Sequence, residues 1–440
     1  MNKISIIFAI SLLIILLSSS MCLMLNNDSI VISRESGITK AIYKNNIIIS
    51  DTSTEFVINS VLVSYKDIVL RGDLGEIKNK INLLTDTNIL FDSVVITAKD
   101  ATIFEANNVR NVDLSGNIIV NADNVVILSQ IDSKNINWVA DTVVYGSGRP
   151  LFNGWKGTNI EISNIKAIRF NGNAIFMNAG NDIYIHNINL NLIGTFPESV
   201  DAIIMVHSNQ PETISNWKIE DIVIDGTYSG DEKAVAIAVN GNRAPPWGYD
   251  VSVKNVYIKN YYMDGLDVIN LYGSVVDNFN YDNGVVGGIF VCSDKTIISN
   301  SKVTNTVGSG FGFGDPGCPG RSYSDFRLVD SKVTNSGYAF VTAPSENTKV
   351  SNIEINNLDE SNNEYSLWMG KDTFYGYILG NTYDVKIKNT NLKSPVYFGD
   401  KVTQIKVMST SSDKTKPITV PSALSRIWDS ITNWLSSWSS

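Results

Sequence analysis

The sequence predicts an all-β solenoid, in which short strands form coils that stack along one axis. Three observations support this fold class. Short apolar/polar alternations rich in Ile and Val run from Ser29 to Met408, and no long helical period interrupts them. A turn containing Asn or Asp returns in the second half of this region at intervals of 22 or 23 residues. The remaining intervals are longer by 7 to 15 residues, as expected where loops are inserted into a repeating unit.

Residues 1–25 are predicted to be an export signal or an N-terminal anchor. Lys3 precedes the apolar stretch Ile4–Leu17, and three serines follow at positions 18–20, which is the arrangement of a secretory signal peptide. One alternative is cleavage after Ser20. The other is retention of Ile4–Leu25, whose 22 residues would span about 33 Å as a helix, enough to cross a bilayer. In both cases we expect the chain to be secreted or displayed at the cell surface.

Residues 26–100 are predicted to be a β-rich N-terminal segment, and residues 101–408 the solenoid proper. Alternation continues throughout 26–158, but no turn residue recurs there at a regular interval. Coils before residue 159 therefore cannot be numbered from the sequence.

A column of Asn and Asp residues defines the repeat after residue 159. Each member follows an apolar residue by two positions, as in Ile162-Ser163-Asn164. We expect one tight turn at the same place in every coil, because Asn tolerates unusual turn backbone and its amide can bond the residues above and below. A sandwich or barrel would instead show turns about every 8–12 residues. The column comprises positions 164, 187, 221, 255, 278, 300, 330, 352 and 389, and a second column comprises Asn at 260, 283, 305, 335 and 357.

The C-terminal residues differ in kind. Residues 409–421 are polar and contain Pro, which predicts a linker. Residues 422–440 predict an amphipathic helix with Ser422 as its N-cap. This helix could cover the open end of the solenoid, associate with a second copy or dock on a membrane surface. Its apolar residues recur at steps of three and one and are Leu424, Ile427, Trp428, Ile431, Trp434, Leu435 and Trp438.

Composition excludes several functional classes. The 440 residues carry a net charge of −9, so no basic surface for nucleic acid is expected. Two histidines, His186 and His207, and three cysteines exclude a histidine-rich metal centre and a four-cysteine zinc site.

The Asn column resembles that of the right-handed parallel β-helix, or pectin-lyase-like, superfamily. The resemblance covers about residues 159–408. The superfamily contains polysaccharide lyases, hydrolases and epimerases, viral attachment proteins and adhesins, so it implies contact with carbohydrate more than any one reaction. Two hypotheses stay open: an enzyme that cleaves or epimerises a polysaccharide, and a non-catalytic adhesin or structural protein of an envelope or virion surface.

Asp264 and Asp267 are the candidate catalytic residues. They form an Asp-Gly-x-Asp sequence at the third strand of a coil, the strand that often forms the floor of the substrate groove in this superfamily. The sequence resembles a fragment of the polygalacturonase motif, in which two acids begin a catalytic cluster. The chain departs from that motif one coil later, where Val286 and Gly287 stand instead of an acid, and no His follows His207.

Lyases of this superfamily use an Arg or Lys base and usually Ca²⁺ held by carboxylates. The superfamily resemblance therefore makes Arg243 a candidate base, with Asp264 and Asp267 as candidate Ca²⁺ ligands. If the chain is not a lyase, no cofactor is expected.

Aromatic residues in the predicted loops are the candidate carbohydrate-binding residues. Aromatic faces stack on sugar rings, and loops on a rigid scaffold often carry binding. The alternative is that these rings fix the loops to the coils. The candidates are Tyr228, Trp247, Tyr249, Tyr261 and Tyr262.

Cys292 and Cys318 are predicted to form a disulfide. Cys318 follows Cys292 by 26 residues, and one coil has 22 or 23, so the loop with Cys318 should begin directly above the strand with Cys292. Glycines at 314, 317 and 320 allow this loop to fold back. An extracytoplasmic setting favours the bridge, whereas a reducing one would leave two thiols.

Overall fold

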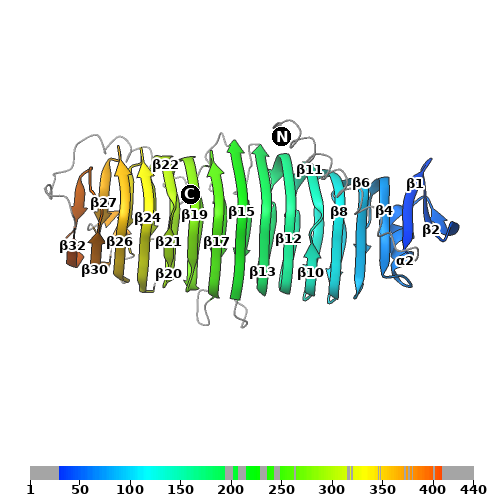
Figure 1. The fold of residues 1–440 in the computed structure, drawn as a ribbon, viewed down its shortest axis with the longest axis horizontal. Helices are drawn as coiled ribbons and strands as arrows, with labels where there is room; N and C mark the ends of the chain where they lie inside the picture. The colour runs from blue at the N-terminus through cyan, green and yellow to red at the C-terminus, as the bar shows by residue number, and fades with distance from the viewer. Residues whose placement is uncertain are drawn as a thin grey trace, which may run out of the picture.

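The chain folds as a parallel β-helix, in which strands of successive coils pair in parallel along one long stack (Figure 1). The structure is a computed structural model that describes residues 29–193, 202–206, 215–227, 235–241, 248–261, 264–314, 318, 321–344, 346, 348–370, 373–374, 377–378, 380–399 and 402–408. The predicted signal or anchor at 1–25, the linker at 409–421 and the helix at 422–440 lie outside these residues.

The elements before residue 150 are β1 (Ile30–Glu35), β2 (Ile38–Tyr43), β3 (Asn46–Asp51), α2 (Thr54–Leu62), β4 (Asp67–Ile77), β5 (Ile81–Asn82), β6 (Thr87–Lys99), β7 (Thr102–Asn107), β8 (Arg110–Asp123), β9 (Val126–Ile131), β10 (Lys134–Trp138) and β11 (Asp141–Gly148). The next are β12 (Phe152–Gly172), β13 (Ile175–Ile193), β14 (Ile203–Val206), β15 (Ser215–Thr227), β16 (Ile237–Asn240), β17 (Gly248–Lys259), β18 (Leu266–Tyr272), β19 (Val275–Gly284), β20 (Gly287–Asp294), β21 (Ile297–Ser299) and β22 (Lys302–Thr306). The last are β23 (Ser309–Phe313), β24 (Tyr323–Thr334), β25 (Tyr338–Thr342), β26 (Lys349–Ser361), β27 (Tyr365–Met369), β28 (Thr373–Phe374), β29 (Tyr377–Ile378), β30 (Asn381–Lys388), β31 (Val396–Phe398) and β32 (Val402–Met408).

Each coil turns at corners where the backbone is left-handed. Asn and Asp occupy most corners, because their short polar side chains accept positive φ more readily than other L-residues. In a regular coil the corners follow one another at steps of five residues, as at Asn352, Asn357 and Asn362. The residues between two corners form a short strand. The residue after a corner points inward, and Ile188, Ile222 and Val256 in this position are buried.

The corner residues form side-chain ladders, as predicted. Asn187 Nδ2 donates to Asn164 Oδ1 at 2.5 Å, and Asn278 Nδ2 donates to Asn255 Oδ1 at 3.0 Å. Asn255 Nδ2 donates in turn to a carboxylate oxygen of Asp221 at 3.0 Å. In all three bonds the amide of the later coil donates to the earlier coil.

The predicted columns are shifted by one corner near residue 350. Leu328 pairs with Ile355, and Asn357 Nδ2 donates to Asp330 Oδ1 at 2.7 Å. Asn357 therefore belongs to the first predicted column, and Asn352 lies one corner earlier. The error arises because an apolar residue precedes both asparagines by two positions, so the sequence around the two corners is alike.

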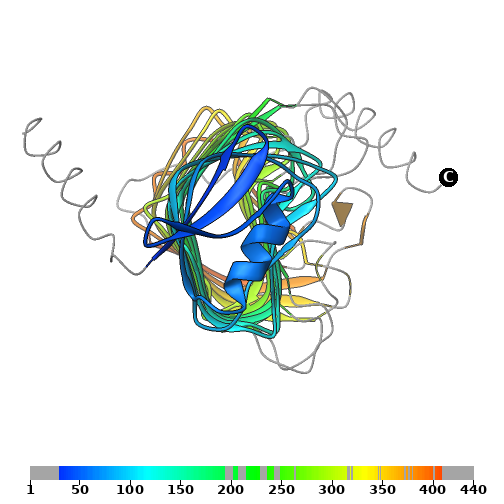
Figure 2. The ribbon, with the colours of Figure 1, turned by 90° about the vertical axis from the view of Figure 1, so that its right-hand side faces the viewer.

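The core fills the interior of the coils, around which the chain winds in superimposed turns (Figure 2). Parallel pairing stacks one apolar side chain on the next at about 4.8 Å, and each fully buried aliphatic side chain contributes about 1.5–3 kcal/mol. One such column is Ile162, Ile185, Ile219, Val253, Val276, Ile298, Leu328, Ile355 and Ile387.

The N-terminal end of the stack is closed by β1, β2, β3 and α2. The three strands form an antiparallel meander, and α2 lies beside it across the end of the coils (Figure 2). Ser53 caps α2 by accepting the N–H of Phe56, and the helix buries Val57 and Ile58 against the core. Parallel pairing of β1 with β4 and of β4 with β6 continues the stack upstream of residue 101. Among the described residues, no helix is long and apolar enough to span a membrane.

We expect Asp221→Asn to stabilise the protein. No hydrogen bond joins Asp221 to Asn187 in the coil below, because a carboxylate has no donor and the Asn187 amide already donates to Asn164. Asparagine would accept from Asn255 and also donate to Asn187, which adds about 0.5–1.5 kcal/mol to the free energy of unfolding. Urea unfolding measures this gain. Asn255→Asp is the matched control and should destabilise, since it removes a donor; a loss of stability in both variants would contradict the ladder argument.

The N-terminal closure should weaken in acid through Glu55. Burial raises the pKa of this carboxyl. Hydrogen bonds from its own N–H, from the N–H groups of Lys78 and Asn79 at 3.0 Å and from Ser53 outweigh burial, so the pKa lies below its ordinary value of 4.5. A depressed folded-state pKa stabilises the fold above the unfolded pKa, and this contribution is lost as the pH falls through the folded value. Glu55→Gln should therefore lower Tm near neutral pH and reduce the fall in Tm between about pH 5 and about pH 3. An equal fall in Tm for both proteins would show that Glu55 does not act this way.

Candidate functional site

The third strands of the coils form one continuous outer surface, which we call the third-strand face. We use this name for the part of the surface after residue 202, which is built by β14, β16, β18, β20, β23, β25, β27 and β31, pairing in this order. The stack continues upstream through the first residues of β13 and β12 to β9 and β7. Because successive side chains of a strand alternate, one column points away from the core. This outward column comprises Ile204, Ala238, Asp267, Phe290, Gly312, Val341, Trp368 and Tyr397.

The long connections of the solenoid begin or end at the strands of this face. After residue 193, each connection of seven residues or more enters or leaves a third strand. The sequence also predicts an inserted loop at 359–365, which is wrong, because residues 359–361 belong to β26 and the added residues of this coil follow β27. The connections are 194–202, 207–214, 228–236, 241–247, 314–322, 370–380 and 389–395.

Asp264 and Asp267 both lie where the chain enters β18, in different surroundings. Asp267 is partly exposed in the outward column, between Ala238 and Phe290. Asp264 is only 7% exposed. Burial, and secondarily the charge of Asp264, raise the pKa of the buried Tyr281 phenol well above its ordinary value. Asp264 therefore sits at the edge of the core.

Gly287 explains why no acid stands one coil above Asp264. The two residues are neighbours in the stack, and a Cβ atom at 287 would lie 2.5 Å from a carboxylate oxygen of Asp264. Glycine leaves room for this carboxylate. A second acid at 287, as the polygalacturonase motif requires, would place two carboxylates in that space.

Aromatic rings line the downstream half of the third-strand face. The Phe290 ring lies against Gly312, where a Cβ atom would come within 2.7 Å of it. Tyr338 stacks on Tyr365 with ring centroids 5.6 Å apart, and Trp368 stacks on Tyr397 at 6.0 Å. These last four rings belong to a hydrophobic cluster separate from the core.

The loop at 314–322 is held to β20 at two points. The predicted disulfide is confirmed: Cys292 bonds Cys318, with Cα atoms 5.8 Å apart. Two residues further along β20, Asp294 accepts from Arg321 Nη1 at 2.6 Å. The Arg321 guanidinium also lies 4.5 Å from the ring centre of Tyr323. Burial raises the pKa of Tyr323 to about 12, aided by Asp294 and opposed by Arg321.

Sequence reasoning missed Asp294 as the partner of Arg321. The available signal was the spacing: Cys292 and Asp294 are two residues apart on one strand, and Cys318 and Arg321 are three apart in the loop. Once the disulfide is predicted, a second contact between these segments follows.

The predicted carbohydrate-binding residues are not all exposed. Tyr261 is 1% exposed, and its carbonyl accepts from Tyr281 Oη at 3.0 Å, so its ring packs in the core instead of facing solvent. The reason is its position directly after the corner at Asn260. Tyr249 is exposed at the start of β17 and meets Tyr272 edge to face at 6.0 Å. The other predicted binding residues, Tyr228, Trp247 and Tyr262, and the candidate base Arg243 lie outside the described residues.

No cluster of three or more His, Cys, Asp or Glu side chains capable of holding a metal ion occurs within the described part of the chain. A protein-bound Ca²⁺ ion is coordinated by about six to eight oxygen atoms. Asp264 and Asp267 alone do not supply such a set, so no chemical step is derived through Ca²⁺.

His186 belongs to a polar network on the outer side of β12, β13 and β15. One ring nitrogen lies 2.9 Å from Glu161 Oε1, and the imidazole stacks on Tyr184 at 4.1 Å. Tyr184 Oη donates to Glu220 at 3.0 Å. Burial and the Glu220 carboxylate raise the pKa of Tyr184 to about 12. These partners agree with a structural role for His186.

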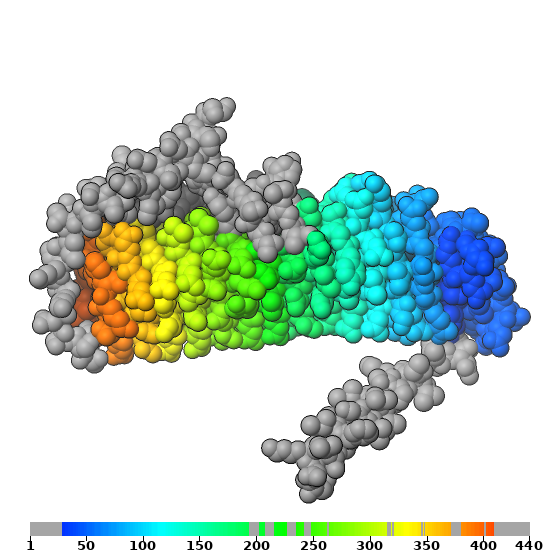
Figure 3. Space-filling model, turned by 90° about the horizontal axis from the view of Figure 1, so that it is seen from above, coloured from blue at the N-terminus to red at the C-terminus, as the bar shows by residue number. Residues whose placement is uncertain are grey.

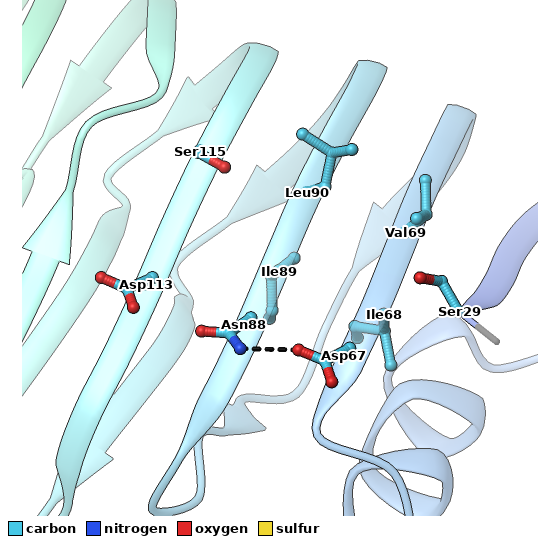
Figure 4. A pocket seen from close by; sticks show the side chains of 9 residues that line it. All are labelled: Ser29, Asp67, Ile68, Val69, Asn88, Ile89, Leu90, Asp113 and Ser115. Carbon is cyan, nitrogen blue, oxygen red and sulfur yellow. Dashed lines mark hydrogen bonds between the residues drawn. The ribbon is translucent and has the colours of Figure 1, made fainter. Parts of the chain in front are cut away.

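A shallow pocket of about 320 Å³ opens on the same side of the stack near its N-terminal end, over β4, β6 and β8 (Figure 4). Three of its polar residues belong to one column of side chains: Asn88 Nδ2 donates to Asp67 at 2.6 Å, and Asp113 is the next member of the column. Asn137 donates to Asp113 in turn, also at 2.6 Å. Asp67, Asn88 and Asp113 are therefore each engaged in a hydrogen bond of this column.

Comparisons with known proteins find neither a matching protein-family model nor a matching curated protein. Solved structures with a similar shape include a mutant tailspike protein of E. coli bacteriophage HK620 in complex with a pentasaccharide (10% identity, TM-score 0.47, 79% of this chain and 63% of that one). A GH87 α-1,3-glucanase catalytic domain in complex with nigerose matches at 16% identity and TM-score 0.40 over 82% of this chain and 66% of the other. A surface adhesin of Streptococcus pneumoniae matches at 9% identity and TM-score 0.40 over 83% and 90%.

The chain spans less than two thirds of the length of the tailspike. The strand pairing described above, rather than these similarities, defines the fold. The predicted parallel β-helix fold is confirmed by this strand pairing.

Proposed function

We propose that this chain is an extracytoplasmic β-helix protein that binds a neutral polysaccharide along its third-strand face. The observation that carries the proposal is the set of three aromatic rings in the outward column, Phe290, Trp368 and Tyr397. Phe290 and Tyr397 are partly exposed, whereas Trp368 is 7% exposed and stacks on Tyr397. Aromatic side chains stack on the apolar faces of sugar rings, and a straight solenoid offers an extended polymer a straight surface.

The charge of the face supports a neutral ligand. In the described outward column the only charged residue is Asp267, and the nearby Arg321 is bonded to Asp294. The chain as a whole carries a net charge of −9. An anionic polymer would meet repulsion from this surface, since like charges across an interface disfavour binding.

Phe290→Ala should weaken polysaccharide binding by about tenfold, because one lost aromatic contact is worth up to about 1.5 kcal/mol. Binding is measured by calorimetry with ligands found on a glycan array that holds neutral and uronate-containing polysaccharides. Tyr145→Ala is the matched control, since Tyr145 is an exposed ring of β11, away from the third strands. Equal affinities of the two variants, or a ligand set limited to uronates, would overturn the proposal.

Catalysis is the second candidate function, and the position of Asp267 beside Phe290 favours testing it. In this proposal Asp264 and Asp267 act as the carboxylate pair, with Arg243 as base and Ca²⁺ as cofactor if the reaction is a lyase reaction. Incubation with polysaccharides, with and without Ca²⁺, would release reducing or unsaturated ends. Loss of these products in Asp264→Asn/Asp267→Asn, with binding retained, identifies an enzyme. Binding without any product identifies an adhesin or a structural surface protein.

A further inference from the structure

The N-terminal closure of the stack is apolar on its outer side. Five of the seventeen large apolar side chains that are exposed among the described residues lie between residues 38 and 63. Three of them are more than half exposed: Ile47 at 56%, Phe56 at 53% and Val63 at 72%. We call the five the apolar cap surface: Ile38, Ile47, Ile48, Phe56 and Val63.

The three elements that carry this surface, β2, β3 and α2, pack against one another across the end of the coils (Figure 2). This end is the dark blue end of the stack in Figure 3. The inner sides of β2 and α2 are buried, as Ala41 on β2 and Ile58 on α2 show. Closing the stack requires only this inner side to be apolar. The outer side faces along the stack axis, where a polar surface would be expected for an end exposed to water.

The sequence next to this surface is the most apolar of the chain. Only three residues, 26–28, separate Leu25 from Ser29, the first described residue, and these four Cα–Cα steps span at most about 14 Å. A bilayer that held this segment would therefore lie against the end of the stack that bears the apolar cap surface.

The charge of the closure fits a lipid surface. Residues 29–66 contain four basic side chains, Arg34, Lys40, Lys44 and Lys66, and three acidic ones, of which Glu55 is buried. This segment is slightly basic in a chain whose net charge is −9. Basic side chains next to exposed apolar ones favour contact with anionic headgroups.

We propose that the apolar cap surface docks on a lipid bilayer, beside the point at which the retained segment Ile4–Leu25 enters it. The solenoid then stands with its N-terminal end on the membrane and its third-strand face along the side. This inference is independent of the proposed function, because it concerns different residues and holds for an enzyme or an adhesin.

The test places an environment-sensitive fluorophore on the cap of the full-length chain. Phe56→Cys is labelled in a Cys22→Ser background, which leaves the Cys292–Cys318 disulfide intact. The control is Val307→Cys, since Val307 is 57% exposed on the side of the stack, between β22 and β23. Both proteins are inserted into phosphatidylcholine vesicles, with and without phosphatidylglycerol, and nitroxide-labelled lipids serve as quenchers. Val63→Cys replaces Phe56→Cys if that variant does not fold.

We expect nitroxide lipids to quench the label at 56 and not the label at 307. We also expect Ile47→Ser/Phe56→Ser/Val63→Ser to reduce quenching at Ile38→Cys by about tenfold or more, from the lost apolar burial. Equal quenching of the labels at 56 and 307 by nitroxide lipids would overturn the proposal. So would protection of position 56 in detergent with a doubled molecular mass, which would identify the occupant as a second copy of the chain. Quantitative release of residues 1–20 from the exported protein would remove the retained segment and overturn it as well.

Discussion

Replacement of Glu360 by alanine is expected to lower the free energy of unfolding of the C-terminal coils by about 3–5 kcal/mol. Glu360 is 0% exposed, and its carboxylate accepts from Asn363 at 2.9 Å, from Ser366 Oγ at 2.7 Å, and from the backbone N–H groups of Lys393 and Ser394. It thus joins β26 and β27 to the segment before β31. Alanine would leave these donors buried without their acceptor, and an unmade buried hydrogen bond costs more than a made one contributes.

Chemical unfolding followed by hydrogen exchange at β26, β27 and β31 measures this loss. Glu364→Ala is the matched control, because Glu364 is exposed four residues away and its loss should change stability by less than about 0.5 kcal/mol. Glu360→Gln should fall between the two, since it keeps one acceptor oxygen and adds an amide that faces donors. If Glu360→Ala and Glu364→Ala unfold alike, the buried carboxylate does not hold these coils together.

The disulfide is expected to have the second large effect. It closes a loop of 26 residues, for which the chain-entropy model gives about 3–4 kcal/mol. Cys292→Ala/Cys318→Ala should therefore lower Tm and expose the segment around β20 and β23 to protease. Asp294 and Arg321 would still hold the far end of the loop, so the loss should grow when Asp294→Asn is added.

Reductant provides the control for this experiment. It should lower the Tm of the native protein to that of the double alanine variant and leave the variant unchanged. A native protein that keeps its Tm after both thiols are shown to be reduced would contradict the stabilising role of the bridge.

The coil repeat could be predicted because it depends on local chemistry. Asn or Asp at a left-handed corner, with an apolar residue two positions before it, is visible in the sequence at every coil from Asn164 to Asp330. The same local rule caused the error at Asn352, because corners recur every five residues and one corner resembles the next. The pairing of Leu328 with Ile355 shows that Asn357, and not Asn352, lies above Asp330 in the first column.

The site was less predictable because it depends on contacts between coils. The disulfide was predicted, since counting one coil length placed Cys318 over Cys292. Tyr261 was misplaced, because its neighbours in the sequence suggest a loop whereas the corner at Asn260 turns it inward. Glu360 gave no sequence signal, as its partners at 393 and 394 meet it only through the stacking of two coils.

The side-chain ladders also give the solenoid an electrical direction. Where an Asn meets an Asp, as Asn111 meets Asp86 and Asn216 meets Asp182, only the amide can donate, and it does so toward the earlier coil. The amide dipoles of such rungs therefore point the same way along the axis and add, as peptide dipoles do along an α-helix. Their positive ends face the N-terminus. The end of the molecule that bears the apolar cap surface is thus the end at which the aligned rungs favour negative charge.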